Sequence, residues 1–257
     1  MFTISATKFS LWKEKQILKG GDKQSLILLI DLLGGLSIKN LNLLKIKSAN
    51  QVDLKISLEE LESCWDKHID TGIPIQYLSG ISYWRDLELE VSNKVLIPRI
   101  ETELVIEIIS ERFQNKEKKI TFVDLGTGSG AICIALALAN PNWNGKATDI
   151  DKNAIEIASR NFTRNSNQSN LEFYNGNWWD PLENFKGKID LAIANPPYIP
   201  QETYEELPLE VKNFEPKCAL LGGVDGLDHI KEIVQNAPLY LKEKGWLLIE
   251  NHFDQGE

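Results

Sequence analysis

A glycine-rich turn between an apolar strand and an apolar helix is the feature that most constrains the fold of this chain. Residues 120–125 (ITFVDL) have the apolar run of a buried strand, and residues 131–136 (AICIAL) begin an apolar helix. Between them, Gly126, Gly128 and Gly130 can adopt dihedral angles closed to other residues and let a ligand approach the backbone. Because this order opens a doubly wound α/β unit, we expect a Rossmann-like domain with a parallel sheet.

The spacing of the glycines indicates which ligand the turn serves. A dinucleotide fingerprint has the spacing G-x-G-x-x-G and places a pyrophosphate at the helix N-terminus. Here the spacing is G-x-G-x-G, and Asp124 stands two residues before the first glycine. A carboxylate there would repel a pyrophosphate but could receive the ammonium group of a methionyl moiety. The turn residues predicted to bind such a cofactor are Gly126, Thr127, Gly128, Ser129 and Gly130.

The next predicted strand ends in an acidic residue that could bind a ribose. Residues 145–149 have the pattern of a strand that ends in Asp149, which is placed to hold a ribose diol through both hydroxyls. The alternative role, the N-cap of the following helix at residues 152–164, suits Asp151 better because it directly precedes that helix. Asp149 is therefore predicted to bind the cofactor.

A third strand, at residues 171–174, leads to Asn177 and Trp178. An adenine would lie here, with Asn177 accepting a hydrogen bond from its amino group and Trp178 flanking the ring. Without the neighbouring motifs, the paired tryptophans Trp178 and Trp179 would indicate only core or surface packing.

The tetrapeptide Asn195-Pro196-Pro197-Tyr198 follows the apolar run of residues 189–194. Proline has no N–H and a fixed φ, so the strand must stop there and present a stiff corner. The plain alternative is a turn after a strand, since Asn-Pro is a common turn pair.

Methyl transfer to a planar NH2 nitrogen needs such a corner. The lone pair of that nitrogen is delocalised, and two acceptors that hold its N–H groups can aim it and partly rehybridise it. The side-chain oxygen of Asn195 and the carbonyl of Pro196 can supply the acceptors, and Tyr198 can pack on the flat group. We therefore predict Asn195 as the catalytic residue.

These motifs together resemble the release factor glutamine N5-methyltransferases (HemK-type), and the resemblance runs from about residue 5 to the end. Its most specific elements are Pro74–Gly80, Leu96–Glu103, Asp124–Gly130 and Asn195–Tyr198. The resemblance implies S-adenosylmethionine as cofactor. It also implies methylation of the glutamine in the Gly-Gly-Gln loop of bacterial class-1 peptide chain release factors, which tunes translation termination.

The resemblance also implies roles for single residues. It places cofactor contacts at Gly126 to Gly130, Asp149 and Trp178, and substrate-amide contacts at Asn195, Pro196 and Tyr198. We add Pro197 to the substrate contacts and Asn195 to the cofactor contacts, because both belong to the same corner.

The chain departs from the family pattern in two places. Ile100 stands where the family usually has proline, and Asn177 stands where it usually has aspartate, which keeps an acceptor but loses a charge. Arg99 and Glu103 lie on a segment that could fold across the cofactor. The alternative interpretation is that Arg99 and Glu103 form a surface salt bridge that contributes little to stability.

The first 80 residues differ in character from the rest. Apolar residues recur at helical spacing, with breaks at Gly20-Gly21 and Gly34-Gly35, a second apolar set over residues 38–46, and a capped helix start at residues 57–60. We expect a small all-helical, substrate-docking domain at residues 1–80. A β-hairpin linker at residues 81–97 and a methyltransferase domain at residues 98–257 follow.

Composition narrows the class of protein. The chain has 257 residues and 42% hydrophobic residues, which allows one large and one small domain. No stretch approaches eighteen apolar residues, and three scattered cysteines suggest neither disulfides nor a metal site. A formal charge of −9 argues against extensive, sequence-independent binding of nucleic acid. We expect a cytoplasmic enzyme without a membrane or nucleic-acid partner.

The C-terminal residues predict an incomplete sheet. Residues 245–250 have the pattern of a fifth strand, after which relatives continue with a helix and a final hairpin. The strands that usually complete the sheet are expected to be missing, which would leave residues 246–250 as an exposed edge.

Other functions stay open at this stage. Methylation of a glutamine in a ribosomal protein would use almost the same motifs. Methylation of an exocyclic amine in a nucleic-acid base would use a similar tetrapeptide but needs a target-recognition domain and a basic cleft. A fourth alternative is a release-factor binder without catalytic activity.

Overall fold

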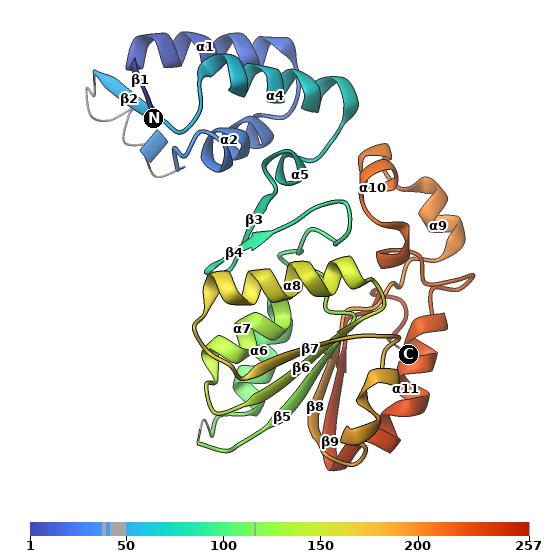
Figure 1. Cartoon of the computed structure of the whole chain (residues 1–257). Coiled ribbons are helices and arrows are strands. Elements are labelled where there is room, and N and C mark those ends of the chain that lie inside the picture. The colour runs from blue at the N-terminus through green and yellow to red at the C-terminus, as the bar shows by residue number, and fades with distance from the viewer. Residues whose placement is uncertain (38–39, 42–49, 116, 257) are drawn as a thin grey trace. The chain divides into compact units, whose positions relative to one another are not determined.

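The chain forms two compact units, Met1–Ile81 and Ser82–Glu257. The computed structural model describes residues 1–37, 40–41, 50–115 and 117–256, and Figure 1 traces them from the N-terminus to the C-terminus. Each unit has hydrophobic core residues of its own.

The first unit is mainly helical, and its helices begin where capping residues predict. Its elements are β1 (Phe2–Ser5), α1 (Ala6–Lys19), α2 (Lys23–Leu32), β2 (Gln51–Leu54), α4 (Leu58–Thr71) and α5 (Ile75–Ser79). Ser57 and Glu60 form the expected capping box at the start of α4, each side chain bonded to the other residue's backbone N–H. The apolar set expected over residues 38–46 falls largely outside the described residues.

The expectation of an all-helical first unit is wrong in one respect. Strands β1 and β2 pair antiparallel, with Phe2 opposite Leu54 and Ser5 opposite Gln51. Each strand has only four residues, and the partners lie far apart in the sequence, so no local pattern signals the pairing.

The second unit contains the expected parallel sheet, in the order β7-β6-β5-β8-β9. The sheet strands are β5 (Thr121–Leu125), β6 (Asn144–Asp149), β7 (Leu171–Asn175), β8 (Ile189–Ala194) and β9 (Leu241–Ile249). The main helices are α6 (Glu103–Arg112), α7 (Ala131–Ala139), α8 (Lys152–Asn165) and α11 (Asp228–Tyr240); the shorter ones are η1 (Asp180–Phe185), α9 (Gln201–Glu206), α10 (Leu209–Phe214) and η2 (Lys217–Ala219). This confirms the doubly wound α/β class.

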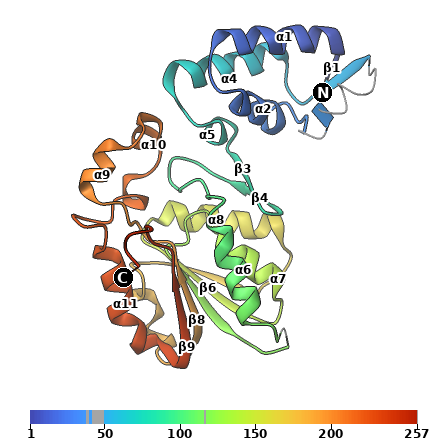
Figure 2. The ribbon, with the colours of Figure 1, turned by 180° about the vertical axis from the view of Figure 1, so that it is seen from behind.

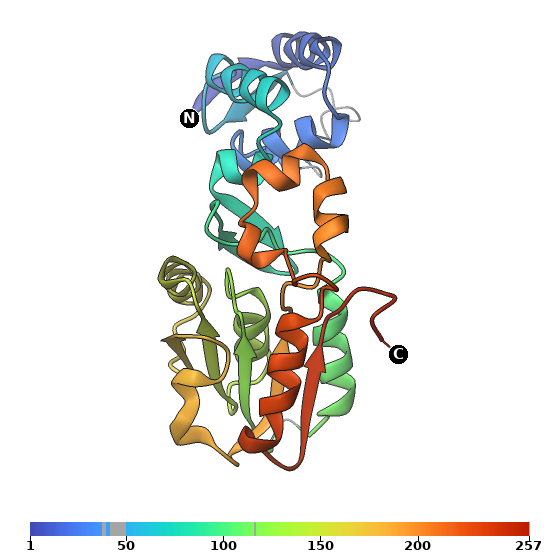
Figure 3. The same ribbon diagram turned by 90° about the vertical axis from the view of Figure 1, so that its right-hand side faces the viewer.

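Successive side chains of the central strands point to opposite faces of the sheet, and each face has a hydrophobic core. Phe122 of β5 and Leu191 of β8 join the core formed with α6, α7 and α8. Val123 and Ala192, one residue further along each strand, join the core formed with α11. Figure 2 shows α6 and α7 lying over the sheet from behind, and Figure 3 shows α11 on the side turned toward the viewer.

The hairpin of β3 (Ile81–Trp84) and β4 (Leu87–Glu90) forms where the alternation predicts, but it is not a separate linker. Arg160 of α8 makes two bonds to the Glu90 carboxylate. The buried Asn161 bonds both backbone groups of Glu90 and the carbonyl of Ser129 in the glycine turn. These bonds fix β4 of the hairpin to α8, within the compact unit that begins at Ser82.

Strand β9 stands last in the strand order of the described sheet. It pairs with β8 alone among the described strands, with a register irregularity near Ile189. Trp246 of β9 is 45% exposed, and the Arg112 guanidinium lies 4.1 Å from its ring centroid. Among the described helices, none combines the length and apolar character needed to cross a membrane.

Candidate active site

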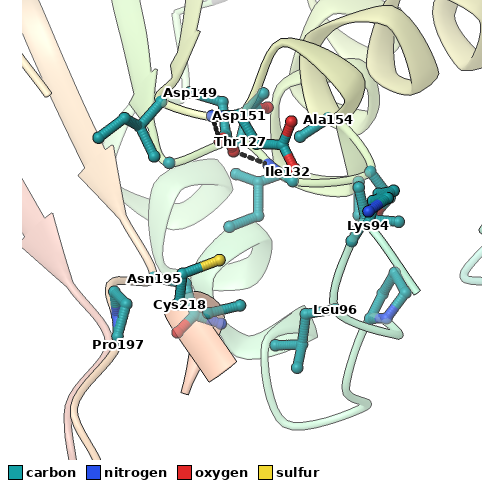
Figure 4. A pocket seen from close by; sticks show the side chains of 18 of the residues that line it. Lys94, Leu96, Thr127, Ile132, Asp149, Asp151, Ala154, Asn195, Pro197 and Cys218 are labelled. Carbon is teal, nitrogen blue, oxygen red and sulfur yellow. Dashed lines mark hydrogen bonds between the residues drawn. The ribbon is translucent and has the colours of Figure 1, made fainter. Parts of the chain in front are cut away.

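A pocket of about 250 Å³ opens at the carboxyl ends of the central strands of the second unit. Ligands of doubly wound folds bind at this edge of the sheet. Of the residues predicted from the sequence, those lining the pocket are Arg99, Gly126, Thr127, Gly128, Ser129, Asp149, Asn177, Trp178, Asn195 and Pro197. Those predicted but not lining it are Gly130, Pro196 and Tyr198. Figure 4 shows Asp149 and Thr127 on one side of the pocket and Asn195 with Pro197 on another.

The glycine turn has the left-handed backbone that its sequence predicts. Gly126 has a φ of 73° and Gly130 a φ of 86°. A Cβ at Gly126 would lie 2.8 Å from a ring carbon of Trp178, so the indole packs directly on the turn. A Cβ at Gly130 would meet Ile134 and Ala158, which explains why this glycine serves helix packing and not the pocket.

Asp124 lies beneath the turn and does not line the pocket, so the structure does not support direct contact with an ammonium group. Its Oδ2 accepts a 2.6 Å hydrogen bond from the Thr127 hydroxyl, and its carboxyl is almost completely buried. Burial raises the pKa of Asp124 from 3.8 to about 6, despite the lowering effect of hydrogen bonds from Thr127 and Cys133. Asp124 therefore braces the turn from inside.

Asp149 lines the pocket at the tip of β6, where the sequence places it. Its Oδ2 accepts from the backbone N–H of Gly128 and its Oδ1 from that of Asp151, both at 2.9 Å. Burial raises the pKa of this carboxyl, and the two backbone bonds work in the opposite direction. Asp151 caps α8 by accepting from Asn153 N, as expected. The carboxylate of Asp149 is thus fixed beside the glycine turn.

The loop after β7 forms another wall of the pocket. Trp178 has a φ of 37°, and its ring centroid lies 5.6 Å from that of His229 on α11. Asn177 also lines the pocket, and its Nδ2 donates to Oε1 of Glu232 at 2.6 Å.

The tetrapeptide presents Asn195 and Pro197 to the pocket, and Tyr198 is held by residues near the C-terminus. Nδ2 of Asn195 donates to the hydroxyl of the buried Thr102 at 3.3 Å, which leaves Oδ1 as an acceptor. The hydroxyl of Tyr198 lies 3.4 Å from Oε1 of Glu250, and Nε2 of Gln255 donates to the Tyr198 carbonyl at 3.0 Å.

Tyr198 of the tetrapeptide and Glu250 beside it both have raised pKa values. Burial is the main cause that raises the pKa of Glu250, with Thr102, Tyr198 and Asn195 lowering it. Burial and the nearby Glu250 carboxyl raise the pKa of Tyr198. Both groups therefore favour their protonated forms more than the same groups in water do.

Comparisons with known proteins agree with this geometry. The chain is 41% identical over 255 residues to a release factor glutamine methyltransferase of Prochlorococcus marinus, a match that covers 99% of this chain and 87% of that protein. This chain belongs to the release factor glutamine methyltransferase family. A protein of the same name from Thermosynechococcus vestitus is 40% identical over 80% of this chain and 71% of its own.

Two further comparisons each match part of the chain. The family model "Methyltransferase small domain" matches residues 100–208. A solved ribosomal protein L11 methylase from Lactobacillus delbrueckii subsp. bulgaricus is similar at a TM-score of 0.40 and 20% identity. That match covers 59% of this chain and 62% of the other. Membership of the methyltransferase family confirms that the chain is a methyltransferase.

The cofactor of this family is S-adenosylmethionine, and the pocket residues fit it. The carboxylate of Asp149 suits a ribose diol, and the face of Trp178 beside Gly126 suits a flat base or sugar. A Cβ at Gly128 would meet nothing within 4 Å, so the turn offers open space to a ligand.

Several pocket residues were not predicted from the sequence. Those not foreseen include Lys94, Val95, Cys218, Ala219 and His229. The segment before α6 does line the pocket, as its resemblance to the family suggested, but Arg99 does not pair with Glu103. Its guanidinium makes bonds of 2.7 and 2.6 Å to the buried carboxylate of Glu215, whereas Glu103 lies 3.7 Å from Arg85. Arg99 therefore ties this segment to the region after α10.

Proposed function

We propose that this protein transfers a methyl group from S-adenosylmethionine to the side-chain amide nitrogen (N5) of a glutamine. The glutamine is that of the Gly-Gly-Gln motif of class-1 peptide chain release factors. The names of the relatives support release factors as substrates. The observation that carries the chemistry is Asn195, because Thr102 occupies its Nδ2 and leaves its oxygen as an acceptor in the pocket.

The corner at Asn195 explains how a weak nucleophile can react. Oδ1 of Asn195 and the carbonyl of Pro196 accept the two N–H groups of the glutamine amide, which aims its nitrogen at the methyl group. The bond from Asn195 to Thr102 and the bond from Gln255 to the Tyr198 carbonyl hold the two ends of the tetrapeptide, which lowers the entropic cost of alignment. Tyr198 is proposed to pack on the flat amide.

When bound, S-adenosylmethionine supplies a methyl group on a positively charged sulfur. Transfer to the amide nitrogen held by Asn195 and Pro196 would leave the electron pair of the broken carbon–sulfur bond on sulfur. The methylated nitrogen then gives one proton to solvent. Asp149, with Gly126 to Gly130 and Trp178, is proposed to hold the nucleoside and amino acid parts of the cofactor.

The unit Met1–Ile81 is proposed to dock the release factor. A glutamine in a flexible loop offers little binding energy by itself, so discrimination requires contacts with the rest of the protein substrate. A net charge of −9 favours a basic protein surface and disfavours direct nucleic-acid binding. The proposed location is the cytoplasm, where release factors act.

Peptide mass spectrometry tests the proposal. Release factor incubated with the protein and S-adenosylmethionine should gain one methyl group on the glutamine of its Gly-Gly-Gln peptide, and nowhere else on that peptide.

A further inference from the structure

A short hydrogen bond at the wall of the cofactor pocket joins the side chains of Asn177 and Glu232. Asn177 follows β7 and lines the pocket, while Glu232 lies on α11, close to the pocket residue His229. Nδ2 of Asn177 donates to Oε1 of Glu232 at 2.6 Å. This contact is as short as the bond that holds Asp124 to Thr127, so it fixes the Asn177 side chain firmly.

The chemistry of the pair decides which way the amide of Asn177 points. A carboxylate only accepts hydrogen bonds, so it must receive the N–H side of the amide. The oxygen and nitrogen of an amide are almost equal in size, and without such a partner the group can turn over at little cost. The bond to Glu232 uses one N–H of Nδ2 and fixes which end of the amide faces the carboxylate, so Oδ1 is the acceptor that Asn177 can offer a ligand in the pocket.

We propose that Glu232 is a positioning residue that makes Asn177 an obligatory acceptor and so selects a cofactor base with an exocyclic amino group. The carboxylate also polarises the amide, which strengthens the bond that Oδ1 can accept. Glu232 thereby supplies, through Asn177, the negative charge that an aspartate at position 177 would carry itself. The inference rests on the proposed placement of the adenine beside Asn177 and is independent of which protein is methylated.

Calorimetric binding to the full chain tests this selection without any release factor. The ligands are S-adenosylhomocysteine and its inosine counterpart, in which oxygen replaces the amino group of the base. In Glu232→Gln the new amide can donate to Asn177 and let its carboxamide turn over. The preference for the amino-bearing ligand should then fall by about five- to tenfold, the worth of roughly one hydrogen bond.

A matched control separates this effect from the loss of a charge. Glu243→Gln removes the same charge from an exposed side chain of β9, outside the pocket, and should leave the preference unchanged. An unchanged preference in Glu232→Gln, including an equal loss of affinity for both ligands, would make Glu232 a structural residue only and overturn the proposal.

A second variant, Asn177→Asp, distinguishes the proposal from the view that position 177 needs only a negative charge. The two views predict opposite changes in binding. Asn177→Asp places two carboxylates within hydrogen-bond distance, and their repulsion should weaken S-adenosylhomocysteine binding by about tenfold or more. The double variant Asn177→Asp/Glu232→Gln restores a donor and should bind within about threefold of the original protein. Tighter or equal binding by Asn177→Asp alone would contradict the proposal. Melting temperatures without ligand verify that each variant is folded, and a failure of release factor methylation would leave these binding ratios unaffected.

Discussion

The side chains of Asn195 and Thr102 meet at the end of β8, where Nδ2 of the asparagine lies 3.3 Å from the threonine hydroxyl. Thr102 is buried just before α6, so this contact joins two segments 93 residues apart. The contact uses an N–H of the Asn195 amide and leaves Oδ1 available to accept a hydrogen bond from a substrate. The catalytic predictions depend on this orientation.

Asn195→Ala should lower turnover by a factor of about 10²–10³, because the variant no longer orients the amide nitrogen of the substrate. Cofactor affinity should stay largely intact, because Asn195 is not a main binding contact of the cofactor. Steady-state kinetics and calorimetry on the same preparation separate the two effects. Asn195→Asp is an informative comparison, since it keeps an acceptor and brings a negative charge near the sulfonium. Near-normal turnover of the alanine variant would refute the mechanism.

Asp149→Ala should weaken S-adenosylmethionine binding by about 1.5–3 kcal/mol, the range for hydrogen bonds to a charged group. The same carboxylate accepts from Gly128 and Asp151, so part of any loss could come from the loop itself. Asp149→Asn keeps acceptor capacity for those backbone bonds and isolates the effect of the charge. An unchanged dissociation constant by calorimetry would show that the ribose contact is wrongly assigned.

Gly126→Ala should reduce both stability and cofactor affinity, because the new Cβ would lie 2.8 Å from the Trp178 ring and the φ of 73° strains any non-glycine residue. The backbone strain alone costs about 1–2 kcal/mol of unfolding free energy. Gly187→Ala is a matched control, with a φ of 66° and nothing within 4 Å of its added Cβ. Denaturant unfolding should show the larger loss for Gly126→Ala, and only that variant should lose cofactor affinity. Equal losses in both variants would mean that the indole contact is unimportant.

The buried carboxyl of Asp124 should make stability depend on pH. Its pKa is raised from 3.8 to about 6, so the folded protein keeps a proton that the unfolded chain releases in this window. The resulting stabilisation is complete below the unfolded pKa and is lost as the pH rises through the folded one. Between about pH 4.5 and about pH 7.5, the original protein should lose about 2 kcal/mol of unfolding free energy relative to Asp124→Asn. Chemical denaturation of both proteins without cofactor measures this difference, and parallel pH profiles would contradict it.

Removal of residues 1–81 should separate recognition from chemistry, provided circular dichroism shows that the remaining unit folds. The shortened protein should still bind S-adenosylmethionine but methylate intact release factor far less well than the full chain. On a short Gly-Gly-Gln peptide, which lacks the docking surface, the two proteins should differ much less. An equal drop in kcat/KM on both substrates would identify the first unit as a folding support.

The sequence predicts those parts of the fold that local patterns encode. The glycine turn, Asp149 at the tip of β6 and the prolines after β8 each follow a run of residues with the pattern of a strand, and their residue types set what the chain does next: glycine allows a tight turn, and proline ends the strand. Parallel strands then bring these ends to one edge of the sheet. For this reason most of the predicted residues lie around one pocket.

Contacts between distant segments could not be predicted in this way. Arg99 and Glu215 are 116 residues apart, and Gln255 reaches the Tyr198 carbonyl across 57 residues. Asn161 sits within an ordinary amphipathic helix, yet it bonds both the hairpin and the glycine turn. Polar side chains of this kind carry no periodic signal, and only the assembled fold determines their partners.

The most direct test of the central claim is the methylation state of a single glutamine. Purified class-1 release factor is incubated with S-adenosylmethionine and either this protein or its Asn195→Ala variant, and the Gly-Gly-Gln peptide is sequenced by tandem mass spectrometry. We expect one added methyl group on the glutamine side-chain nitrogen with the original protein and almost none with the variant. An unmodified glutamine, or methylation that persists in the variant, would contradict it.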